Sequence, residues 1–142
     1  MVEIRFHDTV EDERLKFAVI ISRANGRWVF CKHRDRETYE IPGGHRENGE
    51  SIVDTARREL YEETGALDFS LMPVCAYSVT DPDHSDDQET FGMIFFSEIL
   101  QFEKELHSEI EKIIITELLP EKWTYPLLQP KMIEEAKRRR IL

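Results

Sequence analysis

Three glutamates in the middle of the chain have the spacing of a metal site. Glu59, Glu62 and Glu63 stand at positions i, i+3 and i+4, which places their carboxylates on one face of a helix. Carboxylates crowded beside a core repel one another and lose hydration, and a divalent cation would relieve both costs. With no Cys or His nearby in the sequence, the cluster favours a hard, oxygen-binding ion. Mg²⁺ is the simplest choice, with Mn²⁺ as an alternative, and the pattern argues against zinc.

The residues around the glutamates predict the helix that would present them. Ser51 followed by Asp54 is a capping-box pattern that marks a helix start. Gly65 is a natural left-handed residue for the position after the helix end, so the helix should run to about Thr64. At about 100° per residue, its buried stripe should consist of four apolar residues, Ile52, Val53, Ala56 and Leu60.

The glutamates belong to a longer pattern of glycine, glutamate and arginine positions. The seven fixed positions are Gly44, Glu50, Arg58, Glu59, Glu62, Glu63 and Gly65. At ~6–7% usage of each residue type, chance agreement at a given start is on the order of 10⁻⁹. The pattern resembles the Nudix box, the signature of hydrolases that cleave diphosphate linkages in nucleoside-diphosphate derivatives. One departure is Ala66, where the family usually has a larger aliphatic residue, and this change removes no catalytic group.

The resemblance implies a role for each polar residue of the box. Glu59, Glu62 and Glu63 would hold the metal, or one of them, Glu59 foremost, would instead deprotonate the attacking water. Arg58 would pair with Glu50 and thereby orient the glutamates. The expected reaction is attack of a water molecule on a phosphorus atom of the diphosphate.

Further metal ligands are expected outside the helix. Two glycines after Pro42 let the backbone bend sharply and approach a ligand closely, and the resemblance assigns a metal-binding carbonyl to Gly43 or Gly44. A carboxylate from a later segment often completes the site in the family, and Glu109 is the candidate, although it could equally be a surface residue. Its competitors are Asp86, Asp87, Glu89 and Glu111.

Candidate phosphate-binding residues lie in two places. His45 directly follows the two glycines, where the family often places a phosphate-contacting cation, although an exposed loop histidine is an equal alternative. The remaining candidates are cations at the ends of the first two predicted strands, where solvated side chains are also common. They are Arg23, Lys32, Arg34 and Arg36.

The rest of the chain predicts strands on both sides of the helix. Residues 15–22 form an apolar run, Asn25 and Gly26 make a hairpin turn, and residues 27–33 return as the partner strand. Extended segments are expected at 39–42, 71–80, 91–99 and 111–116, and a helix near the C-terminus starts close to Pro130 and ends in residues 137–140. This order indicates one α+β domain over residues 1–142. The resemblance sharpens it to an α/β/α sandwich with a mixed sheet.

Composition limits the partners. The 142 residues carry a net charge of −10, which disfavours non-specific binding to long nucleic acids and fits a small nucleotide substrate better. The sequence contains no long apolar run, and the charged N-terminus is unlike a signal peptide, so no membrane association is expected. Cys31 and Cys75 suit reduced, buried thiols, and the expected compartment is the cytoplasm. The sequence leaves open whether the protein is a monomer or a homodimer.

The substrate class rests on the resemblance alone. The chain looks most like the MutT-like bacterial branch, which hydrolyses nucleoside triphosphates, including oxidised purine nucleotides such as 8-oxo-dGTP. Alternatives within the family are dinucleoside polyphosphates, RNA 5′ ends and ADP-ribose, the last suggested by Pro82 after the box, which is more simply a turn residue. A non-catalytic nucleotide sensor is disfavoured, because such modules commonly lose box glutamates and this chain keeps them all.

Overall fold

Two long apolar strands form the centre of the structure. Strands β2 (Leu15–Ala24) and β7 (Thr90–Phe102) run parallel, with Ile20 opposite Phe95. The structure is a computed structural model that describes residues 2–81, 88–105 and 110–142. Among these residues the strands form one eight-stranded sheet, in which the order β1-β6-β7-β2-β3-β8 is joined by β4 beside β2 and β5 beside β7. Apart from β2 and β7, the named strand pairs are antiparallel, so the sheet is mixed, as predicted.

The remaining elements follow the chain around this centre. Their bounds are β1 (Glu3–His7), a short 3₁₀ helix (Asp12–Arg14), β3 (Arg27–His33), β4 (Gly43–His45), α1 (Ile52–Thr64), β5 (Ala66–Phe69), β6 (Met72–Thr80), β8 (Ile110–Thr116) and α2 (Gln129–Arg138). Across residues 2–81, 88–105 and 110–142, no helix combines the length and apolar character that a membrane span requires.

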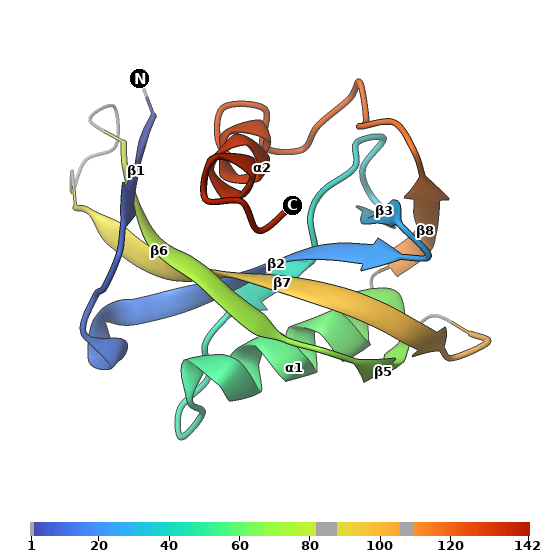
Figure 1. Cartoon of the computed structure of the whole chain (residues 1–142), viewed down its shortest axis with the longest axis horizontal. Helices are drawn as coiled ribbons and strands as arrows, with labels where there is room; N and C mark the ends of the chain where they lie inside the picture. Colours follow the sequence, from blue (N-terminus) through green and yellow to red (C-terminus); the bar gives the residue numbers. More distant parts are fainter. Residues whose placement is uncertain (1, 82–87, 106–109) are drawn as a thin grey trace.

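Both faces of the sheet are covered, and the sequence of β2 shows why. Side chains alternate along a strand, so its near-continuous apolar run must bury residues on each side. Ala18 and Ile20 pack in the core beneath α1, whereas Val19 and Ile21 pack in a second core beneath α2. Figure 1 shows the result, with α1 on one side of the sheet and α2 on the other. The predicted α/β/α sandwich is therefore confirmed.

Helix α1 begins and ends as its sequence predicts. The Ser51 side chain accepts a hydrogen bond from the Asp54 backbone N–H, and the Asp54 carboxylate accepts one from the Ser51 N–H, which completes the capping box. Gly65 ends the helix in the left-handed conformation, at φ 75°. The predicted buried stripe is wrong at Val53, which is 38% exposed, and the buried face also includes Thr55, Glu63 and Thr64.

Two short strands were not predicted, and one predicted segment is shifted. Strands β1 and β5 were missed, since neither stands out as an apolar run. The segment expected at 39–42 makes only isolated bridges, and the strand that follows is β4, formed by Gly43, Gly44 and His45. Gly43 lies so close to β2 that a Cβ there would collide with the Ala18 carbonyl oxygen. The two glycines therefore allow the close pairing of β4 with β2.

Candidate active site

The glutamates of α1 border a cavity of about 600 Å³ that lies between the two helical layers. Glu59 and Glu63 line it from α1, and Gln129 and Met132 line it from α2. Strand β4 contributes the backbone of Gly43 and Gly44 to the same wall, and β3 contributes His33. The fold thus brings the box helix and the two glycines together around one space, as the resemblance implies.

Glu63 is the most firmly held of the three glutamates. Its side chain is 9% exposed, and its Oε1 accepts a hydrogen bond of 2.7 Å from the Gly43 backbone N–H. Its Oε2 lies 3.1 Å from Nε2 of His33. Burial raises the pKa of the Glu63 carboxyl, and these two partners oppose that rise. His33 was not among the predicted site residues, because nothing in the sequence shows that the end of β3 lies beside α1.

Glu59 lies against the other glycine. A Cβ added to Gly44 would collide with the Glu59 carboxylate, so this position needs the smallest residue. The Glu59 side chain is 13% exposed. Burial and the neighbouring Glu63 charge raise the pKa of Glu59 to about 7. Half of its charge would therefore be lost near neutral pH without further compensation.

Glu62 completes the group at its outer side. Its side chain is 46% exposed, and its Oε2 lies 3.3 Å from the Arg58 guanidinium. Glu59 and Glu63 are largely buried and have raised pKa values. Together with Glu62 they form a group of carboxylate oxygens whose negative charge is not fully balanced by nearby cations. Mg²⁺ is a hard cation that binds such oxygens, so the residues present fit this ion, and Mn²⁺ would meet the same ligands.

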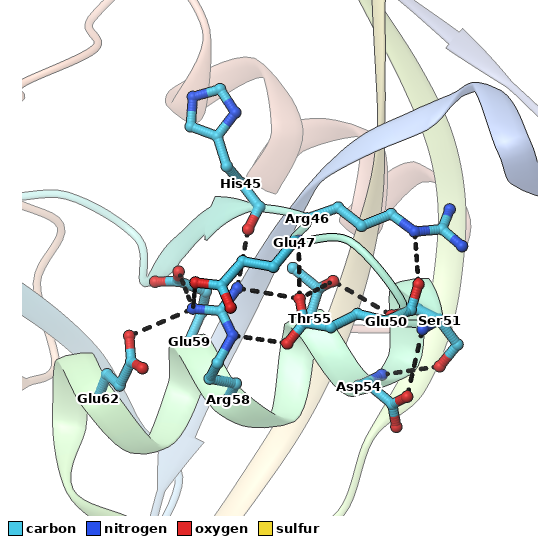
Figure 2. Close-up of polar contacts among 10 residues, drawn as sticks. All are labelled: His45, Arg46, Glu47, Glu50, Ser51, Asp54, Thr55, Arg58, Glu59 and Glu62. Carbon is cyan, nitrogen blue, oxygen red and sulfur yellow. Dashed lines mark hydrogen bonds and ion pairs between the residues drawn. The ribbon is translucent and has the colours of Figure 1, made fainter.

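Arg58 ties the loop before α1 to the glutamates. Figure 2 shows its guanidinium among four carboxylates and one carbonyl. It donates to both Glu50 oxygens, at 2.6 and 3.1 Å, and to the His45 carbonyl oxygen at 2.8 Å. Another of its nitrogens donates to Glu59 Oε1 at 2.8 Å. The arrangement matches the pairing of Arg58 with Glu50 that the resemblance implies.

Glu50 is itself fixed by several donors. Besides Arg58, its carboxylate accepts hydrogen bonds of 2.9 Å from the Glu47 backbone N–H and from the Thr55 hydroxyl. These bonds, that of Arg58 foremost, lower the pKa of Glu50 to about 2. Glu50 therefore remains an anion that holds Arg58 in place while Arg58 contacts Glu59.

The predicted phosphate-binding cations are dispersed. His45 and Arg36 line the cavity, where His45 packs on the Phe17 ring and Arg36 pairs with Glu40 at 2.9 Å. Lys32, by contrast, is buried in an ion pair with Glu111. The remaining two candidates, Arg23 and Arg34, do not line the cavity, and Arg23 stacks on Trp28.

The additional carboxylate expected from a later segment is not placed. Glu109 lies outside the described residues, as do its competitors Asp86 and Asp87. The other two competitors have protein partners, because Glu111 pairs with Lys32 and Glu89 accepts a hydrogen bond of 2.6 Å from the Ser78 hydroxyl.

The apolar wall of the cavity was not predicted from the sequence. This wall includes Phe17, Val19, Tyr77, Val79, Leu128 and Met132. All six also pack in or against the core beneath α2, so in the sequence they are indistinguishable from ordinary core residues. The cavity therefore has carboxylates on one side and an apolar surface with two aromatic rings on another.

Comparison with known proteins assigns this site to a family. The family pattern described as NUDIX domain matches residues 12–137. The chain belongs to the Nudix family. The box described above is thus the family's own signature, and the protein is a hydrolase of diphosphate bonds in a family that generally needs divalent metal ions.

Individual relatives are consistent with this assignment to the Nudix family. The Bacillus subtilis (strain 168) protein YtkD, whose name assigns it provisionally as an 8-oxo-dGTP diphosphatase, is 32% identical over 121 residues, which cover 84% of this chain and 73% of YtkD. An RNA pyrophosphohydrolase of Bartonella henselae is 39% identical over 54 residues, or 36% of this chain and 31% of that protein. The crystal structure of a mutant of the Bacillus subtilis pyrophosphohydrolase BsRppH superimposes with a TM-score of 0.77 at 28% identity, covering 96% of this chain and 90% of that one.

Proposed function

We propose that this Nudix hydrolase cleaves nucleoside triphosphates, including oxidised purine nucleotides, to a monophosphate and pyrophosphate. The observation that carries the proposal is the division of the cavity into a carboxylate side and an apolar side. A volume of about 600 Å³ lies within the range of small-molecule sites. A base could pack against the rings of Phe17 or Tyr77 while the phosphates face Glu59 and Glu63.

The residues of the chain divide the chemistry between them. Glu59, Glu62 and Glu63 are the residues that would hold Mg²⁺, which when bound neutralises phosphate charge and makes coordinated water more acidic. Water attacks a phosphorus atom, and the bond from that phosphorus to the leaving phosphate oxygen breaks. Glu59 is the candidate to accept the proton if it is not itself a metal ligand, because its carboxylate lies at the cavity wall beside Glu63.

The other polar residues of the site position this machinery. Gly43 and His33 fix the two oxygens of Glu63, and Arg58 fixes Glu59 while it remains bound to Glu50. Arg36, at the cavity wall, is the cation best placed to meet the triphosphate, provided that it exchanges Glu40 for phosphate. His45 could donate a further hydrogen bond to a phosphate oxygen.

Hydrolysis of a triphosphate at an RNA 5′ end is the second candidate. The similarity to the Bartonella henselae RNA pyrophosphohydrolase supports it, although that match covers only 54 residues. The net charge of −10 weighs against a polymer, because binding of a polyanion depends on neutralising its phosphates with basic side chains. A free nucleotide therefore remains the first choice.

A panel of substrates tests the proposal. Product release would be measured with Mg²⁺ on dGTP, 8-oxo-dGTP, ATP, ADP-ribose, diadenosine tetraphosphate and a 5′-triphosphate RNA, with Glu62→Gln as an inactive control. The proposal expects a nucleoside triphosphate to have the highest kcat/KM and to give a monophosphate and pyrophosphate. A preference for the RNA or for ADP-ribose would overturn it. Nucleotide binding by the folded protein without any turnover would favour the sensor alternative.

A further inference from the structure

A second group of ligand atoms shares Glu63 with the proposed magnesium site. Cys31 and His33 stand two residues apart on β3, so their side chains share one face of the strand. This face is turned toward α1 and meets Glu63. The Cys31 sulfur, a His33 ring nitrogen and a Glu63 carboxylate oxygen all lie within 4.8 Å of one another. His33 Nε2 and Glu63 Oε2 are 3.1 Å apart.

The chemistry of this group differs from that of the magnesium site. Thiolate, imidazole and carboxylate are the ligands that zinc takes in proteins, with bonds of about 2.0 to 2.3 Å. Ligands at such bond lengths lie about 3 to 4 Å from one another around a tetrahedral ion. Because the three atoms already lie within 4.8 Å of one another, small side-chain movements would close the group on one ion. The sequence argued against zinc because no Cys or His is near the glutamates along the chain, but the fold brings both residues to Glu63.

We propose that Cys31, His33 and Glu63 form a site for Zn²⁺ or another sulfur-binding divalent ion, and that filling this site inhibits the enzyme by withdrawing Glu63 from Mg²⁺. The inhibition rests on the proposed role of Glu63 as a magnesium ligand. Binding itself does not depend on that role, because it requires only the three side chains.

The residues around the group indicate how an ion would enter and which residue is a candidate fourth ligand. His33 and Glu63 line the cavity, whereas Cys31 is fully buried behind them, so the ion would arrive from the cavity. Glu40 has its Oε2 3.4 Å from His33 Nε2, and its backbone pairs with Cys31 through two hydrogen bonds of 3.0 Å. Its carboxylate is a candidate for the fourth position, provided that its side chain moves and leaves its ion pair with Arg36. The thiol proton and any proton on His33 Nε2 would leave for solvent as the bonds to the metal form.

Cobalt provides the test, because a Co²⁺–thiolate bond absorbs in the near ultraviolet whereas oxygen and nitrogen ligands alone do not. The intact protein would be titrated with Co²⁺ and then with Zn²⁺ as competitor, beside Cys31→Ser. Cys75→Ser is the matched control, because Cys75 is the other buried free cysteine but packs in the core beneath α2. The thiolate band should appear in the wild type and in Cys75→Ser and be absent in Cys31→Ser. Zn²⁺ should bind to Cys31→Ser at least about tenfold more weakly.

Measurements of turnover test whether Zn²⁺ bound at this site inhibits the enzyme. With Mg²⁺ in large excess, added Zn²⁺ should slow the wild type and Cys75→Ser, and a markedly higher concentration should be needed for Cys31→Ser. Circular dichroism would verify the fold of each variant. If Cys31→Ser fails to fold, His33→Gln serves in its place and should lose Zn²⁺ affinity by a similar factor. The proposal is overturned if the wild type shows no thiolate band, or if Zn²⁺ affects all variants equally, which would place the ion on the box glutamates alone.

Discussion

Replacement of Arg58 by Lys removes the forked guanidinium that joins the loop before α1 to the glutamates. Arg58 makes five hydrogen bonds, two to Glu50 and one each to the His45 carbonyl oxygen, Glu59 and Glu62. A lysine ammonium offers three donors on a single atom and cannot span these positions. At least two of the bonds are therefore lost, and Glu59 loses the group that orients it.

The expected magnitudes follow from this count. A hydrogen bond to a charged group contributes about 1.5 to 3 kcal/mol, and because the Arg58 side chain is 22% exposed, the lower end of this range applies. Loss of two bonds then costs about 3 kcal/mol of the free energy of unfolding. For 142 residues the entropy of unfolding is about 0.3 kcal/mol per kelvin, so Tm should fall by about 10 °C. Misorientation of Glu59 should lower kcat by about 10- to 100-fold, with little change in KM.

Arg57→Lys is the matched control, since Arg57 precedes Arg58 on α1 but is exposed. Thermal unfolding followed by circular dichroism gives Tm, and steady-state kinetics at saturating Mg²⁺ give kcat and KM. Arg57→Lys should stay within about 0.5 kcal/mol of the wild type. The reasoning is refuted if Arg58→Lys matches Arg57→Lys in both Tm and kcat. A fall in Tm with unchanged kcat would refute the orienting role while leaving the structural role intact.

Three further perturbations test separate parts of the site. Glu62→Gln should lower kcat by orders of magnitude, because it removes the charge of a proposed metal ligand. Its Tm should not change, because the Glu62 side chain is 46% exposed. Steady-state kinetics and thermal unfolding measure the two effects. Gly44→Ala should reduce kcat at least about 100-fold, because the new Cβ displaces the Glu59 carboxylate and small misplacements at a reacting centre are costly. Glu50→Gln should be less stable than the wild type at neutral pH, and urea unfolding at several pH values should show this difference vanish in acid. The pKa of Glu50 is about 2 in the fold against an ordinary 4.5, so its contribution is complete above pH 4.5 and is lost as the pH falls toward 2.

Each of these expectations has a contrary result. Full activity of Glu62→Gln would remove it from the metal ligands. Gly44→Ala with wild-type kcat would show that Glu59 can move away from β4 without consequence. A stability difference between wild type and Glu50→Gln that persists unchanged down to pH 2 would mean that the Glu50 charge does not stabilise the fold.

The box helix could be predicted from the sequence because its signals are local. Ser51, Asp54 and Gly65 act within one turn of the helix ends, and the structure has both caps where the sequence indicates them. The same holds for β2 and β3, which are joined at Asn25 and Gly26, two residues with positive φ. The family and the sandwich fold followed from the box and are confirmed.

What the sequence could not show depends on contacts between distant segments. The parallel pairing of β2 with β7 joins residues more than 70 positions apart. The contact of His33 with Glu63 depends on how α1 lies beneath β3. Phe17 and Tyr77 line the cavity, yet they are ordinary core residues in the sequence. Lys32 was expected near phosphates, but its buried side chain pairs with Glu111, a partner that only the register of β3 and β8 reveals.

The most direct test of the central claim measures metal binding and turnover in the same samples. After treatment with EDTA, Mn²⁺ would be titrated into the wild type and into a variant with Glu59, Glu62 and Glu63 all changed to Gln. Electron paramagnetic resonance would measure bound Mn²⁺, and the release of pyrophosphate would measure dGTP hydrolysis. The account predicts that the metal-free wild type is inactive, that activity rises in step with bound Mn²⁺, and that the variant neither binds the ion at this site nor turns over dGTP. Turnover that persists in EDTA, or tight Mn²⁺ binding by the triple variant, would contradict it.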